Sequence, residues 1–291
     1  MAGEDRDHAG ADHGRRHARL GAGDPRDRLG DALAALARAR PRAVGLDVVL
    51  PDRSYDVFAP GADQALITGV VALRRVAPVV LGLAVRADGT PRPVHAPLIA
   101  AAGRAGFAVL PQDDDGRIRR YDEQLDAGGG VVPTLVGEMA RVLGTVPERG
   151  LIQYALGEGY GYVPLRDLLR WAADGRDDEL ALRFGGRPVL VGAVLPFEDR
   201  KRQPVPLARW ERTLDVPGVL VHAQALRTAL AGATVREAPW PVTLALLVVP
   251  RRCGSCATGA GASPRCSAPG SPRTRSARCS CASGSSCRSA R

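Results

Sequence analysis

Apolar residues recur along the chain with the spacing of helices and of buried strands. Leucines at helical spacing behind Pro25, which suits a helix start, predict a helix over residues 26–39. The run 43–50 is apolar on both pleat faces except at Asp47. Such a run is typical of a parallel strand that is buried on both sides. The folded part is therefore expected to begin with a helix and a buried strand.

The same pattern continues through the middle of the chain. A helix over 62–75 and an apolar run over 79–85 complete a βαβ unit, which should be right-handed. The further elements expected are helices at 96–104, 133–144, 165–171 and 218–231, and strands at 107–110, 117–123, within 151–163 and at 188–194. The Asp115-Gly116 pair predicts a hairpin between strands 107–110 and 117–123. Alternating strands and helices predict an α/β fold with a mixed, mainly parallel sheet flanked by helices and an antiparallel hairpin.

The leader, residues 1–24, lacks this pattern. It is polar and rich in His, Asp and Arg, so we expect it to be disordered. A metal-binding tract of His8, His13 and His17 is the alternative, but ligands need a fixed geometry that this segment does not supply. No apolar run of seven or more opens the chain, so no signal peptide or N-terminal anchor is expected.

The C-terminal part changes character twice. Residues 239–250 begin like a membrane segment with Trp240 at the interface, but two arginines interrupt the run at about half of the ~20 residues that a spanning helix needs. Residues 251–291 are rich in Arg, Ser and Cys, a composition that cannot bury a core. We interpret this tail as a shifted reading frame, since GC-rich codons for Leu, Val and Ala read one base out give Arg, Cys, Gly and Ser. The organisation expected is a leader, one domain over 25–238, an interrupted membrane segment and a disordered tail.

The excess of positive charge and all the cysteines lie in the tail. The net charge is +9, but eight of the 40 basic residues and no acidic residue lie in 251–291, so residues 1–250 are almost neutral. Nucleic acid is therefore not an expected partner. All six cysteines lie in the same tail, where the Cys253–Cys256 pair has no apolar neighbours to form a zinc-nucleated core. No metal and no cofactor are expected.

Nucleophilic hydrolysis is disfavoured because Ser54 is the one serine before the tail and no cysteine precedes the tail. No nucleophile elbow exists. The acidic run at 113–116 could suggest a calcium loop, but its first position would be Pro111 and its twelfth Asp122 in place of a bidentate Glu. A turn is the better interpretation. No catalytic residue is assigned.

Three places could bind a ligand. Asp47 sits inside an apolar strand, where an unpaired carboxylate is costly, so it needs partners that are either structural or part of a site. The charged loop 198–202 follows a strand, and the carboxyl ends of parallel strands are where α/β sheets bind ligands; a solvated charge run is the alternative. His222 lies on an apolar helix face, where a hydrogen-bonded core histidine is the alternative to a ligand-binding one.

In their order, six segments resemble the second class of CHASE domain, the cyclase/histidine-kinase-associated sensory extracellular modules of bacteria. They span residues 25–232 and are 25–28 (PRDR), 43–47 (AVGLD), 113–120 (DDDGRIRR), 188–192 (PVLVG), 198–200 (EDR) with Pro204, and 217–223 (PGVLVHA). The resemblance implies an extracytoplasmic α/β sensor without catalytic activity. It also implies a membrane helix before the sensor, and two or three helices and an output module such as adenylate cyclase, protein kinase or diguanylate cyclase after it.

This chain is expected to depart from that plan at both ends. The anchor and the usual first strand are missing, and the tail stands where the downstream helices should follow. The resemblance places the sensor on the periplasmic or extracellular side of the membrane, whereas this chain alone leaves a cytosolic or non-functional fragment open. The expected partner is an unknown small-molecule signal, and a homodimer is left open.

We expect Asp47, Asp199 and His222 to converge at one edge of the sheet, with Arg119 or Arg200 satisfying a carboxylate. The candidate ligand-binding residues are Asp47, Arg119, Glu198, Asp199, Arg200 and His222. Two alternatives remain. One is a metal-dependent hydrolase that uses Asp47, Asp52 and Asp199. The other is an interaction-only domain, favoured if no cavity lies at the carboxyl edge of the sheet.

Overall fold

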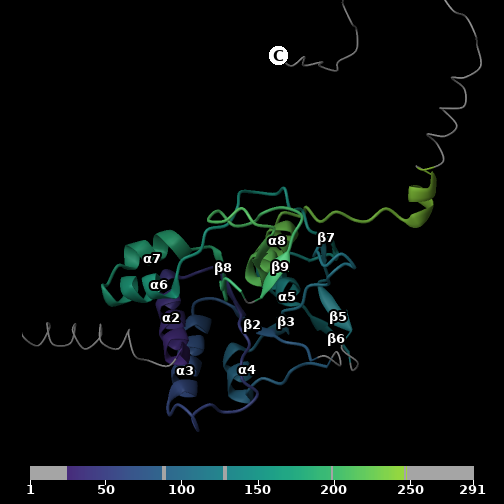
Figure 1. Ribbon diagram of the computed structural model, residues 1–291. Coiled ribbons are helices and arrows are strands. Elements are labelled where there is room, and N and C mark those ends of the chain that lie inside the picture. Colours follow the sequence, from purple (N-terminus) through teal and green to yellow (C-terminus); the bar gives the residue numbers. More distant parts are fainter. Residues whose placement is uncertain (1–24, 87–89, 127–129, 198, 246, 248–291) are drawn as a thin grey trace, which may run out of the picture. The chain divides into compact units, whose positions relative to one another are not determined.

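The computed structural model describes residues 25–86, 90–126, 130–197, 199–245 and 247 (Figure 1). The chain divides into two compact units, Met1–Glu237 and Ala238–Arg291. The first unit contains all the strands and helices named below. In the second, a helical turn begins at Trp240, and the Thr243 amide donates to the Pro239 carbonyl at 3.2 Å. The predictions for the leader, 1–24, and for the tail, 251–291, concern residues outside the described part.

A four-stranded parallel sheet with the strand order β3-β2-β1-β8 forms the centre of the first unit. β1 (Ala43–Asp47) lies between β2 (Val79–Leu83) and β8 (Pro188–Gly192), and β3 (Ala105–Phe107) pairs with the far side of β2. The continuous apolar runs of β1 and β2 suit this central position because both of their faces are covered. The mixed α/β fold predicted from the sequence is confirmed.

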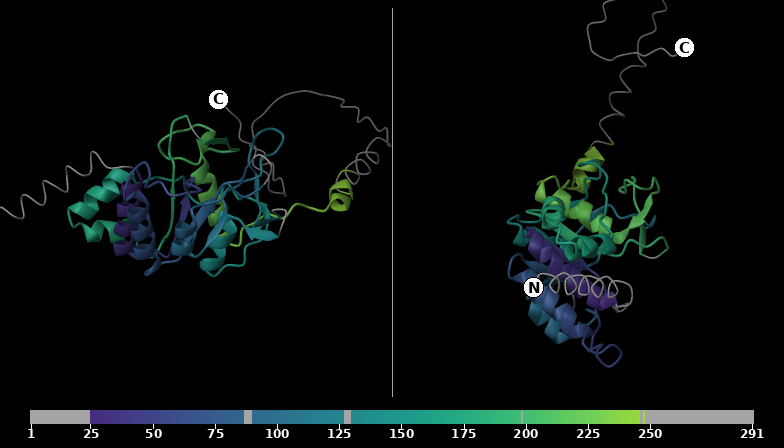
Figure 2. Two further views of the ribbon diagram at one scale, coloured as in Figure 1. Left: turned by 90° about the horizontal axis from the view of Figure 1, so that it is seen from below. Right: turned by 90° about the vertical axis from the view of Figure 1, so that its left-hand side faces the viewer.

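Helices cover both faces of the sheet (Figures 1 and 2). One face is covered by α2 (Pro25–Ala39), α3 (Ala62–Arg74) and α4 (Ala96–Ala102), and on that side α6 (Leu165–Ala173) and α7 (Asp177–Phe184) pack against α2. The other face is covered by α5 (Leu135–Val142) and α8 (Gly218–Leu230). Two hydrophobic cores result, and the sheet separates them.

Successive residues of the central strands belong to opposite cores. Val44 and Leu46 of β1 pack into the core under α2 and α3, whereas Ala43 packs into the core under α5 and α8. Gly45 also faces the α5 side, where a Cβ would lie 3.2 Å from the sulfur of Met139 and 2.6 Å from Cδ2 of Leu190. Glycine at this position gives those two side chains their room.

Short antiparallel pairs surround the sheet. They are β4 (Arg120–Tyr121) with β7 (Gly150–Leu151), β5 (Gln124–Asp126) with β6 (Val131–Pro133), and β9 (Arg200–Arg202) with β10 (Asp215–Pro217). The hairpin expected between 107–110 and 117–123 is wrong, because β3 pairs with β2 and β4 pairs with β7. The turn itself does form: the Asp113 amide donates to the Arg117 carbonyl at 2.8 Å, and Gly116 has a φ of 76°.

Burial of the predicted strands on both faces is only partly correct. β1 ends at Asp47, after which Val48 is half-buried and Val49 is 64% exposed. β8 is a terminal strand of the sheet, so Val191 is half-buried instead of fully enclosed. An apolar run therefore predicted the strand correctly but not its place at the edge.

Candidate functional site

The carboxyl ends of β1 and β8 meet at one edge of the sheet, where Asp47 is the register partner of Gly192. The chain continues from β8 into β9, and β10 leads directly into α8 at Gly218. α8 packs against β8, β9 and β10 (Figure 1). This topology brings the last residue of β1, the residues just before and within β9, and the first turn of α8 to the same edge.

Asp47 is the partly buried acid of this group. Burial raises the pKa of its carboxyl from 3.8 to about 6. The negative charge of Asp199 adds to the rise, and the positive charge of Lys201 opposes it. No ion pair or hydrogen bond of the Asp47 carboxyl is found among the described residues, so its raised pKa is the expected response to burial without a full counter-charge.

Asp199 lies against the start of α8. Its carbonyl accepts a hydrogen bond from the Gly218 amide at 2.9 Å. Its carboxylate is so close to Gly218 that a Cβ there would be 2.4 Å from Oδ2. The φ of Asp199 is 48°, in the left-handed region that few residues other than glycine adopt. The carboxylate therefore lies beside the first residue of α8, near the positive end of the helix dipole, although no described amide of the first turn donates a hydrogen bond to it.

Lys201 supplies the counter-charge, with its Nζ 3.4 Å from Oδ1 of Asp199. The arginines expected in this role lie elsewhere. Arg119 binds Asp113 and Asp115, each at 2.6 Å, and Arg200 binds Glu211 at 2.7 Å and the Asp215 carbonyl. The expectation that Arg119 or Arg200 would satisfy Asp47 or Asp199 is wrong.

Lys201 was not among the candidates chosen from the sequence. One signal could have singled it out, since it is the only lysine in a chain whose other 39 basic residues are arginine. Glu198, which was chosen, lies outside the described residues. Lys201 lies 3.4 Å from Asp199, and its positive charge acts on the pKa values of both Asp47 and His222.

His222 lies within α8, 5% exposed. Burial lowers the pKa of its imidazole to about 4, and the positive charge of Lys201 lowers it further. The ring is therefore neutral at pH 7. Its Nδ1 is buried and has no hydrogen-bond partner among the described residues. The sequence left open a core histidine whose ring nitrogens are hydrogen-bonded. Nδ1 of His222 does not fit that alternative, because it has no such bond among the described residues.

The alternatives weighed from the sequence can be compared with this geometry. Within the described ranges, no group of three or more His, Cys, Asp or Glu is placed to hold a metal ion. Asp47, Asp52 and Asp199 therefore do not form the carboxylate set that a metal-dependent hydrolase needs. Two cavities lie away from the carboxyl edge, one between β4, β7 and the segment 236–237 and one at the amino ends of β2 and β3.

The protein is thus an α/β domain with helices on both faces of a parallel sheet, and within its described residues no group of three or more His, Cys, Asp or Glu is placed to hold a metal ion. Residues 16–250 match the family described as the CHASE2 domain. The chain belongs to this family of extracytoplasmic sensory domains, which are sensory and not catalytic. No curated protein and no solved structure matches the chain. None of the helices in the described residues has the length and apolar character needed to cross a bilayer.

Proposed function

We propose that this chain is the sensing part of a bacterial transmembrane signalling protein and that the carboxyl edge of its sheet binds a small anionic signal molecule. In this proposal the sensor faces the periplasm or the cell exterior. The output module, an adenylate cyclase or a protein kinase, belongs to a longer protein. Membership of the CHASE2 family supports the sensory role.

The observation that carries the ligand class is the position of the Asp199 carboxylate, between the first turn of α8 and Lys201. A helix N-terminus with a neighbouring ammonium group is a place that binds anions. Asp199 lies beside that place, in a left-handed backbone conformation. A carboxylate or phosphate group of a ligand could replace it, and Asp199 would then move out with the segment that precedes β9.

The single lysine makes the proposal testable in the whole chain. Reductive methylation with ¹³C-formaldehyde labels Lys201 as the only side-chain amine. Its NMR signal is then followed during titration with inorganic phosphate and, separately, with acetate. We expect a saturable shift, and tighter binding in Asp199→Ala because the internal competitor is gone. Asp52→Ala is the matched control, since Asp52 is an exposed carboxylate outside the site.

Two results would overturn the proposal. One is a Lys201 signal that neither anion moves. The other is an affinity that is the same in Asp199→Ala and Asp52→Ala. A homodimer remains a prediction of its own, which sedimentation of the full chain measures independently of ligand.

A further inference from the structure

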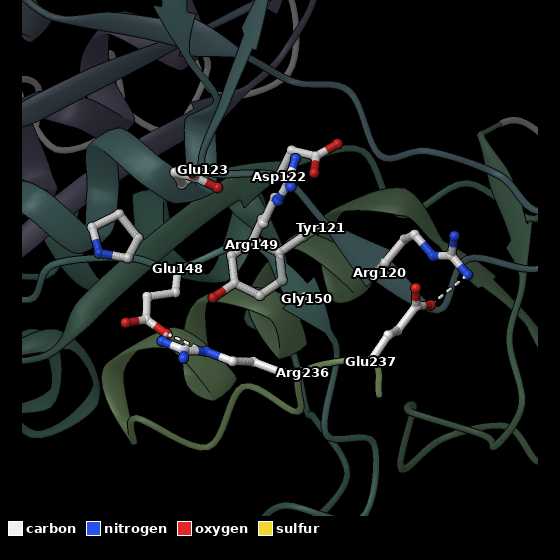
Figure 3. A pocket seen from close by; sticks show the side chains of 10 residues that line it. Arg120, Tyr121, Asp122, Glu123, Glu148, Arg149, Gly150, Arg236 and Glu237 are labelled. Atoms are coloured by element: carbon white, nitrogen blue, oxygen red, sulfur yellow. Dashed lines mark hydrogen bonds and ion pairs between the residues drawn. The ribbon is translucent and has the colours of Figure 1, made fainter. Parts of the chain in front are cut away.

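A second candidate ligand site lies at the end of the first unit, away from the sheet edge. A cavity of about 540 Å³ is bounded by β4, the residues that lead into β7, and Arg236 and Glu237 (Figure 3). This volume is within the range of about 300–1,000 Å³ that is usual for small-molecule sites. The cavity is therefore large enough for a metabolite.

Arg236 and Glu237 form one wall of the cavity, and the segment 234–237 to which they belong is bound to the rest of the unit by several contacts. Val235 exchanges backbone hydrogen bonds with Leu151, at 2.9 and 3.3 Å. The hydroxyls of Tyr121 and Thr234 are 2.9 Å apart. Two ion pairs flank Tyr121: Arg236 with Glu148 at 2.6 Å, and Arg120 with Glu237 at 2.9 Å (Figure 3). A ligand in this cavity would touch both the body of the domain and the segment that ends the unit.

Three further charges in the lining have no ion-pair partner in the described part of the chain. Arg149, Asp122 and Glu123 make no ion pair with any residue that the structure describes, although all three line the cavity. Oε2 of Glu123 is buried and has no hydrogen-bond partner there. A buried carboxylate oxygen without a donor is costly, and a ligand that donates hydrogen bonds removes the cost once the Glu123 side chain turns this oxygen into the cavity.

These charges define what the cavity can hold. The unpaired guanidinium of Arg149 favours an anionic group, preferably a carboxylate, which it can bind through two hydrogen bonds. The carboxylates of Glu123 and Asp122 favour an ammonium group. Arg149 would repel a purely cationic ligand, and Asp122 and Glu123 would repel a purely anionic one. A metal ion does not fit, because the described residues offer no group of three ligands here.

We propose that this cavity binds a free amino acid, with its ammonium group at Glu123 and Asp122 and its carboxylate at Arg149. Binding would bridge β4 and β7 to Arg236 and Glu237 and so hold the end of the unit more firmly. The site is separate from the sheet edge and does not depend on an anion binding there.

The test is a set of titrations of the full chain with each of the twenty amino acids. The concentration reaches about 10 mM, where a ligand with a Kd near 1 mM is almost saturating. We expect at least one of them to raise the Tm and to give a saturable calorimetric signal. Acetate and methylamine, which carry one charged group each, should bind at least about tenfold more weakly. Slower hydrogen exchange at the amides of 234–237 in the bound state would show that the ligand reaches this segment.

Variants locate the site. Arg149→Gln and Glu123→Gln should each weaken binding about tenfold or more, because each removes a charge-assisted hydrogen bond. Arg149 is exposed, so its variant should fold as the parent does. Arg75→Gln, at the other cavity, is the matched control and should leave the affinity unchanged. Asp199→Ala should leave it unchanged as well, which separates this site from the sheet edge.

The proposal is overturned if none of the twenty binds at about 10 mM. It is also overturned if one binds with the same affinity in the parent, Arg149→Gln and Glu123→Gln, because the ligand would then lie elsewhere.

Discussion

The amide of Gly218, the first residue of α8, donates a hydrogen bond to the carbonyl of Asp199 at 2.9 Å, and the carboxylate of the same aspartate covers the glycine. A side chain at 218 and the present position of Asp199 exclude each other. The lack of a Cβ at 218 is thus what lets the loop before β9 close over the helix N-terminus.

Gly218→Ala should therefore destabilise the domain, by about 1–3 kcal/mol if the loop cannot relax. Alanine favours helices over glycine, so helix propensity alone predicts the opposite sign. Urea unfolding measures the difference. Gly161→Ala is the control, since a Cβ there meets nothing within 4 Å, and its effect should stay within about 0.5 kcal/mol. Equal stability of parent and Gly218→Ala would contradict the contact.

Asp47 should make the folded state less stable as the pH rises. Its carboxyl has a pKa of about 6 in the folded chain and 3.8 when unperturbed, so the folded state binds more protons between these values. The stabilisation is complete below pH 3.8 and is lost as the pH rises through 6, by on the order of 1–3 kcal/mol. Asp47→Asn should remove this loss and be at least as stable as the parent at pH 7. Urea unfolding at several pH values from 4 to 8 measures it.

His222 should contribute with the opposite sign. Its pKa is about 4 when folded and 6.5 when unperturbed, so the unfolded state binds the extra proton in this range. Stability from this group is complete above pH 6.5 and is lost as the pH falls through 4. In the parent the two groups partly cancel between pH 4 and 6. Asp47→Asn should then show stability that rises with pH, and His222→Gln stability that falls. The same slope in both variants would refute the assignment.

Tyr121 and Glu148 both contact the segment 234–237, but they should contribute differently to the free energy of unfolding. Tyr121 is fully buried, and its hydroxyl is 2.9 Å from that of Thr234. Tyr121→Phe should cost about 0.5–1.5 kcal/mol, the usual value of a hydrogen bond. The Arg236–Glu148 pair is more than half exposed on both sides, so Glu148→Ala should cost less than about 0.5 kcal/mol. Thermal unfolding measures both, and the reverse order would contradict the argument.

The central strands could be predicted from the sequence because their signal is local. Apart from Asp47, every residue of the runs 43–47 and 79–83 is apolar. Such runs predict strands that are covered on both faces. β9 could not be predicted in this way. Its residues Arg200, Lys201 and Arg202 have no apolar alternation, and the strand forms through backbone pairing with β10. α7 was also missed, since only Leu180 and Phe184 of its eight residues are buried.

The candidate site shows the same division. Asp47 was identifiable because a carboxylate interrupts an apolar strand. The partners of Arg119 and Arg200 could not be predicted in this way, because a guanidinium pairs with whichever carboxylates the fold brings nearest to it. Asp113 and Asp115 lie within six residues of Arg119 and hold it at the turn. The place of Asp199 on α8 depends on how the chain returns through β9 and β10, which no local pattern encodes.

The alternation of β1 between two cores has a consequence for how the protein tolerates change in length. Removing or adding one residue within 43–47 would exchange the two sets of side chains, so that Val44 or Leu46 would have to enter the space that Gly45 leaves to Met139 and Leu190. A change of rotamer cannot correct this exchange, because every following side chain of the strand also moves to the opposite face. Indels in β1 should therefore be far rarer among functional variants than apolar substitutions at the same positions.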